Sequence, residues 1–427
     1  RSGHIQAIVG IASLLILWVS LWGTSPIQRL FPDNMAILVG RGLDLSPLIR
    51  ILFLFIYPAL GLVFGYHWLR PSNPSLVPAG LAMLSPMAAS LMVSNKGFGA
   101  ILMVAAMILL VPALYNGRFQ AASAAWRFFL MISVAILPLV VAVWFITIGQ
   151  PNLPIARVSF LIAALLLLGG FPFFIWIAGL ARKASLPSLP LTLGILAAIF
   201  VFFLLSQLDD APAIRSAAEF QAVLLWCAAA TAILAGFMML RADSPRELFV
   251  YTVVLDMAFM IPVLALTGIA GKEIALLGLI GRFMGLVLVM IGLNFVQEGD
   301  QPVHAKPFPG PSNSIQSFAT VYGLLTLLGL PLTVGYSGRW AQLTAISAIS
   351  PPDIIPIIPA LMVIAMTLGT FAVIRIFARQ SFDRRVASTE ENRAVTYFTF
   401  GILGISIVVG LLPQLITRLV STLLISF

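Results

Sequence analysis

The chain has 427 residues, of which 60% are hydrophobic and only 9% are charged. Ordinary soluble domains are about 25% charged, so this composition excludes a soluble globular protein. The net charge of +9 does not indicate nucleic-acid binding, because the basic residues stand singly in short connections between apolar runs, a pattern typical of membrane topology. A single cysteine, Cys227, excludes a disulfide framework and a thiolate metal cluster.

A helix needs about 20 apolar residues to cross the roughly 30 Å hydrocarbon core of a bilayer. Thirteen apolar runs approach this length, so the sequence predicts an all-α integral membrane protein with a single polytopic domain over residues 1–427. In chain order, the predicted helices cover 4–23, 47–68, 77–95, 98–115, 124–148, 157–180, 188–207, 219–241, 247–268, 273–296, 316–345, 354–378 and 395–423. Polar connections separate them; 301–311 is the longest polar link, and 380–393 is the most charged.

The connections also predict an orientation. Lys and Arg are retained on the cytoplasmic side, and more of them fall in the connections on the side of the N-terminus. We therefore expect a cytoplasmic N-terminus and a C-terminus on the opposite side. The first apolar run lacks a small-residue cleavage site and is predicted to be a membrane helix rather than a signal peptide.

Two of the predicted helices, 157–180 and 316–345, are interrupted by glycine and proline. The interrupting residues are Gly169, Gly170 and Pro172 in the first helix, and Gly329, Pro331 and Gly335 in the second. Non-helical backbone at membrane depth is tolerated only where it faces protein or a water-filled cavity, and paired broken helices are typical of transporter cores. The alternative is that these residues are packing kinks, as is common in membrane helices. The Gly281 and Gly285 spacing favours close helix packing rather than a site.

Four segments resemble one known family, the antiporter-like subunits of proton-pumping NADH-quinone oxidoreductase (complex I) and of Mrp-type sodium/proton antiporters. The segment GGFPFFIWIAGLARKASLPSLP at 169–190 resembles the family's GAFPFHSWLPDAHxxAPTPVS. Downstream, SPRELFVYTVVLDMAFMI at 244–261 is similar to DLKRLLAYSSIAHMGFVL, and GLPLTVGYSGRW at 329–340 is similar to GLPPLAGFxGKF. A weaker similarity is RGLDLSPL at 41–48 to the family's DGLS segment.

The resemblance implies an inverted-repeat fold with broken seventh and twelfth helices among fourteen. Here the broken helices are predicted to be sixth and eleventh, so we expect that one N-terminal helix of the family is lacking. The two repeats would cover 98–241 and 247–427, the latter with the C-terminal helices. The expected location is an energy-coupling membrane, either a bacterial plasma membrane or a thylakoid-type membrane.

Proton transfer through such a subunit needs titratable groups at mid-membrane. The resemblance places charged residues of the family on its fifth, seventh and eleventh helices. At the first two of these positions this chain has Met107 and Leu167, and near the eleventh-helix position it has Met284. These side chains hold no proton. The sequence therefore predicts a scaffold whose proton path is degenerate.

Three charged residues lie deep in predicted helices: Asp256, Arg282 and Arg339. Arginine hardly ever deprotonates, and a lone charge at the bilayer centre costs at least about 2.5 kcal/mol, so each charge should have a partner. We predict a buried ion pair between Asp256 and Arg282. Such a pair could hold helices in register without moving protons.

Three interpretations remain open from the sequence. The first is a structural or degenerate membrane-arm subunit of a complex-I-like NAD(P)H or ferredoxin-quinone oxidoreductase, in contact with other membrane-arm subunits and lipid. The second is an autonomous cation/proton antiporter or secondary transporter that uses Asp256. The third is an active subunit with a rearranged water path through Asp256 and the hydroxyls of Tyr251, Thr252 and Tyr336.

No catalytic motif, metal-ligand cluster or cofactor-binding motif is found in the sequence, and the chain is not expected to be catalytic alone. If the first interpretation is right, flavin, iron–sulfur clusters and quinone belong to other subunits.

Overall fold

The computed structural model describes residues 2–21, 37–38, 41–43, 45–71, 73–115, 119–266, 268–296, 314–349, 357–382 and 393–426. Within these ranges the regular secondary structure is helical except for one short antiparallel pair, β1 (Ile37–Leu38) with β2 (Arg41–Gly42), and an isolated bridge between Leu43 and Val93. Ten of the described helices are long and apolar enough to cross a membrane, and three shorter apolar helices accompany them. The prediction of an all-helical membrane protein is confirmed. The polar link 301–311 and most of the charged link 380–393 lie outside the described residues.

The first half of the chain contains α1 (Ser2–Leu21), α3 (Pro47–Leu69), α4 (Leu76–Met92), α5 (Lys96–Leu114), α6 (Phe119–Thr147), α7 (Pro154–Leu168), α8 (Ile175–Lys183), α9 (Ala197–Asp210), α10 (Pro212–Arg215) and α11 (Ala218–Arg241). The second half contains α12 (Pro245–Ala258), α13 (Gly268–Val296), α14 (Ser314–Leu328), α15 (Gly335–Ile349), α16 (Ile357–Phe382), α17 (Arg393–Leu411) and α18 (Pro413–Ser426).

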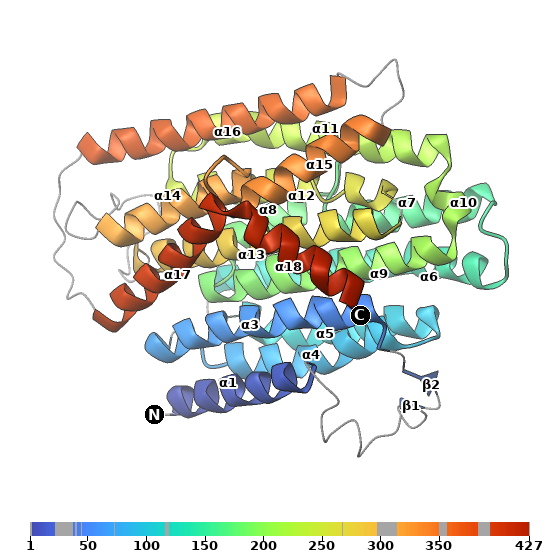
Figure 1. Ribbon diagram of the computed structural model, residues 1–427, viewed down its shortest axis with the longest axis horizontal. Coiled ribbons are helices and arrows are strands. Elements are labelled where there is room, and N and C mark those ends of the chain that lie inside the picture. The colour runs from blue at the N-terminus through green and yellow to red at the C-terminus, as the bar shows by residue number, and fades with distance from the viewer. Residues whose placement is uncertain are drawn as a thin grey trace.

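The long helices run roughly side by side, with α1, α3, α4 and α5 at one edge of the bundle and α11 and α16 at the other, as Figure 1 shows. Helix α13 lies in the interior, where it packs along α14 and crosses α15. The crossing with α15 is close because glycines face each other: a Cβ added to Gly338 would lie 2.7 Å from the Cα of Gly278. Small residues at such contacts allow helix backbones to approach in a membrane. The packing interpretation of Gly281 and Gly285 is supported by the same geometry, since added Cβ atoms there would meet α15 and α14.

Both predicted interruptions are present. Helix α7 ends before Gly169 and α8 begins at Ile175, while α14 ends before Gly329 and α15 begins at Gly335. Gly169 and Gly329 both have positive φ, 62° and 73°, the left-handed conformation in which helices commonly terminate.

Three of the segments predicted to be single helices are divided or irregular. The segment 247–268 is not one helix, since α12 ends at Ala258 and a separate turn of 3₁₀ helix follows at Pro262–Ala265. The segment 188–207 is irregular in its first half, with a π-helical stretch at Pro190–Leu196 before α9 begins. The segment 395–423 is divided into α17 and α18 at Pro413. Pro262 explains the division of 247–268 and Pro413 explains that of 395–423, because proline has no N–H to donate to the carbonyl four residues earlier in a helix.

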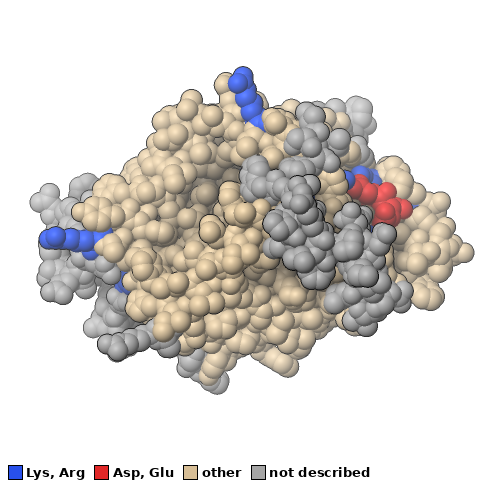
Figure 2. Space-filling view, turned by 60° about the horizontal axis from the view of Figure 1, so that its bottom comes forward, with Lys and Arg blue, Asp and Glu red and all other residues tan. Residues whose placement is uncertain are grey.

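The outer surface is consistent with a lipid environment. Figure 2 shows a face that is almost entirely uncharged, with Lys and Arg at a few points and an acidic group near one end. Large apolar side chains are exposed on many helices; Leu137 of α6 is 68% exposed, and Trp144 is 63% exposed. In a bilayer such side chains contact lipid or another membrane protein, so large exposed apolar side chains are expected on this surface.

Candidate functional site

The first broken helix is closed by uncharged groups. At the end of α7, Gly170 N–H donates to Leu165 O at 2.8 Å, and the indole N–H of Trp176 on α8 donates to Leu166 O at 2.9 Å. The next amide, Phe171 N–H, donates to Thr231 Oγ1 of α11 at 2.8 Å. These three hydrogen bonds at the break are made without a titratable side chain.

The second broken helix has a similar backbone geometry but a charged cap. Leu330 N–H donates to Leu325 O at 3.1 Å, repeating the six-residue hydrogen bond of the first break. The C-terminal end of α14 is buried and is capped by Arg339 of α15, whose Nη2 donates to Leu327 O at 2.6 Å. An added Cβ at Gly329 would lie 2.5 Å from the Cβ of Arg339, so only glycine leaves room for this arginine.

At the unpredicted end of α12, the carbonyl oxygen of Asp256 accepts from Phe259 N–H at 3.2 Å. Met260 N–H donates to Met257 O at 3.0 Å instead of continuing the α-helical pattern to Asp256 O. The carbonyl oxygen of Asp256 is therefore available to a second donor, and Arg282 Nη2 of α13 occupies it at 3.0 Å. Pro262 is the sequence feature that coincides with this early termination.

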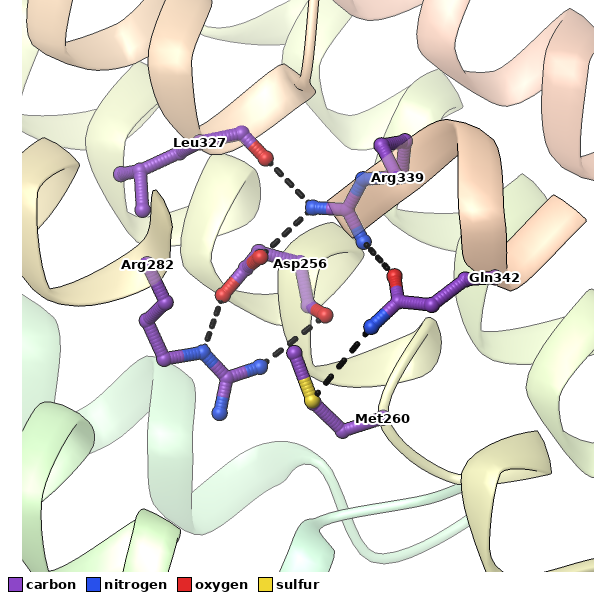
Figure 3. A network of polar contacts seen from close by, with 6 residues as sticks. All are labelled: Asp256, Met260, Arg282, Leu327, Arg339 and Gln342. Atoms are coloured by element: carbon purple, nitrogen blue, oxygen red, sulfur yellow. Dashed lines mark hydrogen bonds and ion pairs between the residues drawn. The ribbon is translucent and has the colours of Figure 1, made fainter. Parts of the chain in front are cut away.

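These groups form one buried cluster at the centre of the second half of the chain (Figure 3). The Asp256 carboxylate accepts from Arg282 Nε through Oδ2 and from Arg339 Nη2 through Oδ1 at 2.6 Å. Arg339 Nη1 donates to Gln342 Oε1 at 3.1 Å. The exposed fractions of Asp256, Arg282 and Arg339 are 2%, 2% and 4%. The predicted pairing of Asp256 with Arg282 is present, and Arg339 joins the same carboxylate.

The cluster joins four helices and balances its charge with helix ends. Two guanidinium groups face a single carboxylate, which leaves one positive charge. The C-terminus of a helix is equivalent to about −0.5 elementary charge, and two such ends contribute acceptors here, Asp256 O from α12 and Leu327 O from α14. The guanidinium carbon of Arg339 also lies 4.0 Å from the ring centroid of Phe259, a favourable cation–π contact.

The cluster is compact, although its hydrogen bonds are not complete. Among the described residues, Arg282 Nη1 and Arg339 Nε are buried and have no hydrogen-bond partner. At the edge of the cluster, Gln342 Nε2 donates to Met260 Sδ at 3.7 Å. Since arginine keeps its proton and the one carboxylate is held by two arginines, the arrangement is suited to holding helices and poorly suited to releasing protons.

The positions predicted to have lost charge lie apart from this cluster. Met107 of α5 and Leu167 of α7 are buried, with exposed fractions of 1% and 0%. Met284 of α13 is half-buried and lines an apolar cavity of about 140 Å³ between α3, α13 and the segment that precedes α9. Met107 and Leu167 belong to the buried hydrophobic core.

The hydroxyls proposed for a rearranged water path do not converge on Asp256. Thr252 donates to Leu248 O of its own helix at 2.8 Å. Tyr251 receives a hydrogen bond from Arg182 at 2.9 Å, and Tyr336 stacks on Trp340. None of these contacts reaches the carboxylate of Asp256.

Gln342 and Arg246 are among the buried polar residues that the sequence did not single out. Gln342 contacts the cluster, and its position three residues after Arg339 on α15 is the signal that could have found it. Arg246 is 6% exposed at the start of α12 and donates to Ala184 O at 2.9 Å, which ties the end of α8 to α12. Its place at a predicted helix end gave no indication of burial.

The sequence matches no protein-family model and no curated protein, but the fold matches solved structures. A chain of the Mrp complex from Dietzia sp. DQ12-45-1b is similar with a TM-score of 0.78 and 12% identity, over 99% of this chain and 92% of that chain. A chain of the membrane-bound sulfane sulfur reductase, an archaeal respiratory membrane complex, has a TM-score of 0.75 and 15% identity, over 98% of this chain and 74% of that chain.

A third similar structure is a chain of respiratory complex I from Thermus thermophilus, with a TM-score of 0.73 and 15% identity, over 97% of this chain and 93% of that chain. All three are chains of multi-subunit membrane complexes. At these identities the similarity establishes the fold, and it confirms that this chain has the antiporter-like fold that the sequence motifs indicated.

Proposed function

We propose that this chain is an antiporter-like membrane-arm subunit of a complex-I-like NAD(P)H or ferredoxin-quinone oxidoreductase, in which it serves as a structural element with a degenerate proton path. The proposal is supported by the fold similarity over nearly the whole chain to subunits of three membrane complexes. Flavin, iron–sulfur clusters and quinone would belong to other subunits, in either a bacterial plasma membrane or a thylakoid-type membrane.

The single observation on which the proposal depends is the pairing of Asp256, the only carboxylate among the buried residues that the structure describes. Within the described part of the chain, Asp256 accepts from two arginines at once. A proton carrier needs water or a second titratable group within hydrogen-bond reach, whereas each carboxylate oxygen of Asp256 is engaged by a guanidinium group. The cluster thus acts as a fixed connection between α12, α13, α14 and α15.

The two broken helices support the proposal in a second way. Both end in a left-handed glycine and a six-residue hydrogen bond, which is what two repeats of one ancestral unit, over 98–241 and 247–427, would be expected to share. The first break is now capped by Trp176 and the second by Arg339. We infer that the repeats kept the backbone and replaced the titratable side chains.

The test is the composition of the native assembly. A tag on this chain should recover, after mild solubilisation, several membrane proteins of the same fold together with peripheral subunits that contain iron–sulfur clusters. Recovery of this chain alone, or only with copies of itself, would overturn the proposal.

The alternative is an autonomous secondary transporter with Asp256 as its coupling carboxylate. The observation in its favour is that the cluster lies at the second broken helix and at the end of α12, and broken helices are where such transporters bind ions. In liposomes, an autonomous transporter would dissipate an imposed pH or sodium gradient, and Asp256→Asn would abolish that activity. A structural subunit would show neither effect.

A further inference from the structure

Helix α1 packs along α3 at the edge of the bundle (Figure 1), and two close contacts fix the register of the pair. A Cβ added to Gly10 would lie 3.1 Å from a ring carbon of Phe64, and one added to Gly3 would lie 3.4 Å from the Cβ of Pro71. The two helices are therefore antiparallel. Since both rise 1.5 Å per residue, residues 6 and 7 of α1 lie level with residues 68 and 67 of α3.

The C-terminal end of α1 is fastened to α3 by two hydrogen bonds. Trp18 Nε1 donates to Leu54 O at 3.0 Å, and Arg50 Nε of α3 donates to Leu21 O at 2.8 Å. Both donors come from long side chains that reach a backbone carbonyl of the other helix. The N-terminal end of the same contact also has polar side chains, but buried atoms of these side chains lack hydrogen-bond partners.

The first of these side chains is His67, which is 1% exposed. Neither of its ring nitrogens has a hydrogen-bond partner among the described residues, and the same is true of the buried Oε1 of Gln6. His67 lies three residues after Phe64 and four before Pro71, so the helical period places it on the side of α3 that faces α1. Gln6 has the corresponding position on α1, between the two glycines that contact α3. The imidazole and the amide oxygen thus lie at nearly the same level on facing sides of the two helices.

A second imidazole lies at the rim of this place. His4 is exposed, stands three residues before the fully buried Ala7, and lies within electrostatic range of His67. Helix α1 begins at Ser2 and α3 ends at Leu69, so the three side chains gather where two membrane-spanning segments end. Ions in the aqueous phase can reach His4 there.

The donor atoms define the kind of ligand that fits. A buried imidazole with no partner is costly, and its free nitrogen lone pair is the donor that Zn²⁺ and Cu²⁺ prefer. Mg²⁺ and Ca²⁺ prefer carboxylate oxygens, and no group of three or more His, Cys, Asp and Glu that could hold a metal ion occurs in the described part of the chain. Two imidazole nitrogens, one amide oxygen and one water molecule would complete a four-coordinate site.

We propose that His4, Gln6 and His67 bind a divalent transition-metal ion of the Zn²⁺ or Cu²⁺ type. The ion fastens the N-terminal end of α1 to α3, as Trp18 and Arg50 fasten the other end. All three ligands belong to this chain, so the site needs no other subunit and does not depend on the proposed function.

The test uses the full chain in lipid nanodiscs, without a polyhistidine tag. Calorimetry with Zn²⁺ gives the affinity and the number of ions bound. Pulsed electron paramagnetic resonance with Cu²⁺ counts the coordinated imidazoles, because the remote ring nitrogen of each one modulates the signal. The chain has three histidines, and the third, His304, lies outside the described residues, so His304→Gln is a matched control.

One Zn²⁺ per chain and a Cu²⁺ signal with two imidazoles are expected. Because losing even an outer-shell partner of a metal ligand costs about 10–100-fold in affinity, His4→Gln should weaken Zn²⁺ binding at least about tenfold and leave one imidazole on Cu²⁺. His4 is exposed, so this substitution leaves the packing intact, and His67→Gln should have the same effect. Gln6→Leu should weaken binding while both imidazoles remain, and His304→Gln should change neither readout.

The proposal is overturned if the chain binds no Zn²⁺ at micromolar concentrations, or if Cu²⁺ has a single imidazole. It is overturned equally if His304→Gln weakens binding as much as His4→Gln does, which would show adventitious binding to surface histidines.

Discussion

Neutralising Asp256 is the sharpest perturbation of the buried cluster. Asp256→Asn keeps the size of the side chain but removes its negative charge, so that two buried arginines face each other with no anion between them. Asparagine offers one acceptor oxygen and one N–H₂ donor. Whichever way the amide turns, Arg282 or Arg339 meets a donor instead of the oxygen it now contacts.

The contacts give the expected size of the effect. The carboxylate accepts one side-chain hydrogen bond from each arginine, and a hydrogen bond to a charged group contributes about 1.5–3 kcal/mol, so that two give roughly 3–6 kcal/mol. Removing one partner of a buried ion pair typically destabilises a protein by about 3–5 kcal/mol. The two estimates agree, and we expect Asp256→Asn to lower the free energy of unfolding by about 4 kcal/mol.

The assay is the free energy of unfolding in lipid bicelles, measured for the wild type, Asp256→Asn and a matched control, Asp209→Asn. Asp209 also contacts two basic residues, Arg215 and Lys272, but its side chain is 34% exposed, so its loss should change stability by at most about 1 kcal/mol. Replacing the whole cluster, by Asp256→Leu with Arg282→Met and Arg339→Met, should restore most of the lost stability. If Asp256→Asn is no more destabilising than Asp209→Asn, the cluster does not hold the helices together.

Three further substitutions test other parts of the structure by the same unfolding assay. Gly338→Ala should destabilise by about 1–3 kcal/mol through overpacking against α13, whereas Gly404→Ala, with no atom within 4 Å of the added Cβ, should not; equal effects would contradict the close crossing. Trp176→Phe should lower stability by about 1–3 kcal/mol because a buried carbonyl loses its donor, and an unchanged value would show that water replaces the indole. Leu167→Lys should cost at least about 2.5 kcal/mol, and a neutral outcome would reveal a polar environment in the first half.

The sequence predicted the helices well because transmembrane segments are set by composition over about 20 residues. It also located both broken helices, since glycine and proline within an apolar run leave few other structures possible. It missed the early end of α12, where Pro262 lies in a run that is otherwise apolar throughout. A proline in a membrane helix can either kink it or end it, and neighbouring helices decide which.

For the candidate site, the sequence identified the three charged residues because charges within membrane helices are rare. It predicted one pair, whereas the structure has both Arg282 and Arg339 on Asp256. The difference arises because the second contact depends on the crossing of α13 and α15 and on the freed carbonyls of α12 and α14, which are tertiary features. The gathering of His4, Gln6 and His67 was beyond sequence reasoning for the same reason, since it depends on the register in which α1 packs on α3.

The most direct measurement of the central claim is proton flux through the purified chain in liposomes with an imposed pH gradient. If the buried charges are a fixed connection between helices, the gradient should decay at the rate of protein-free liposomes, and Asp256→Asn should leave that rate unchanged. A faster decay that Asp256→Asn abolishes would contradict the account and would identify Asp256 as a transport carboxylate.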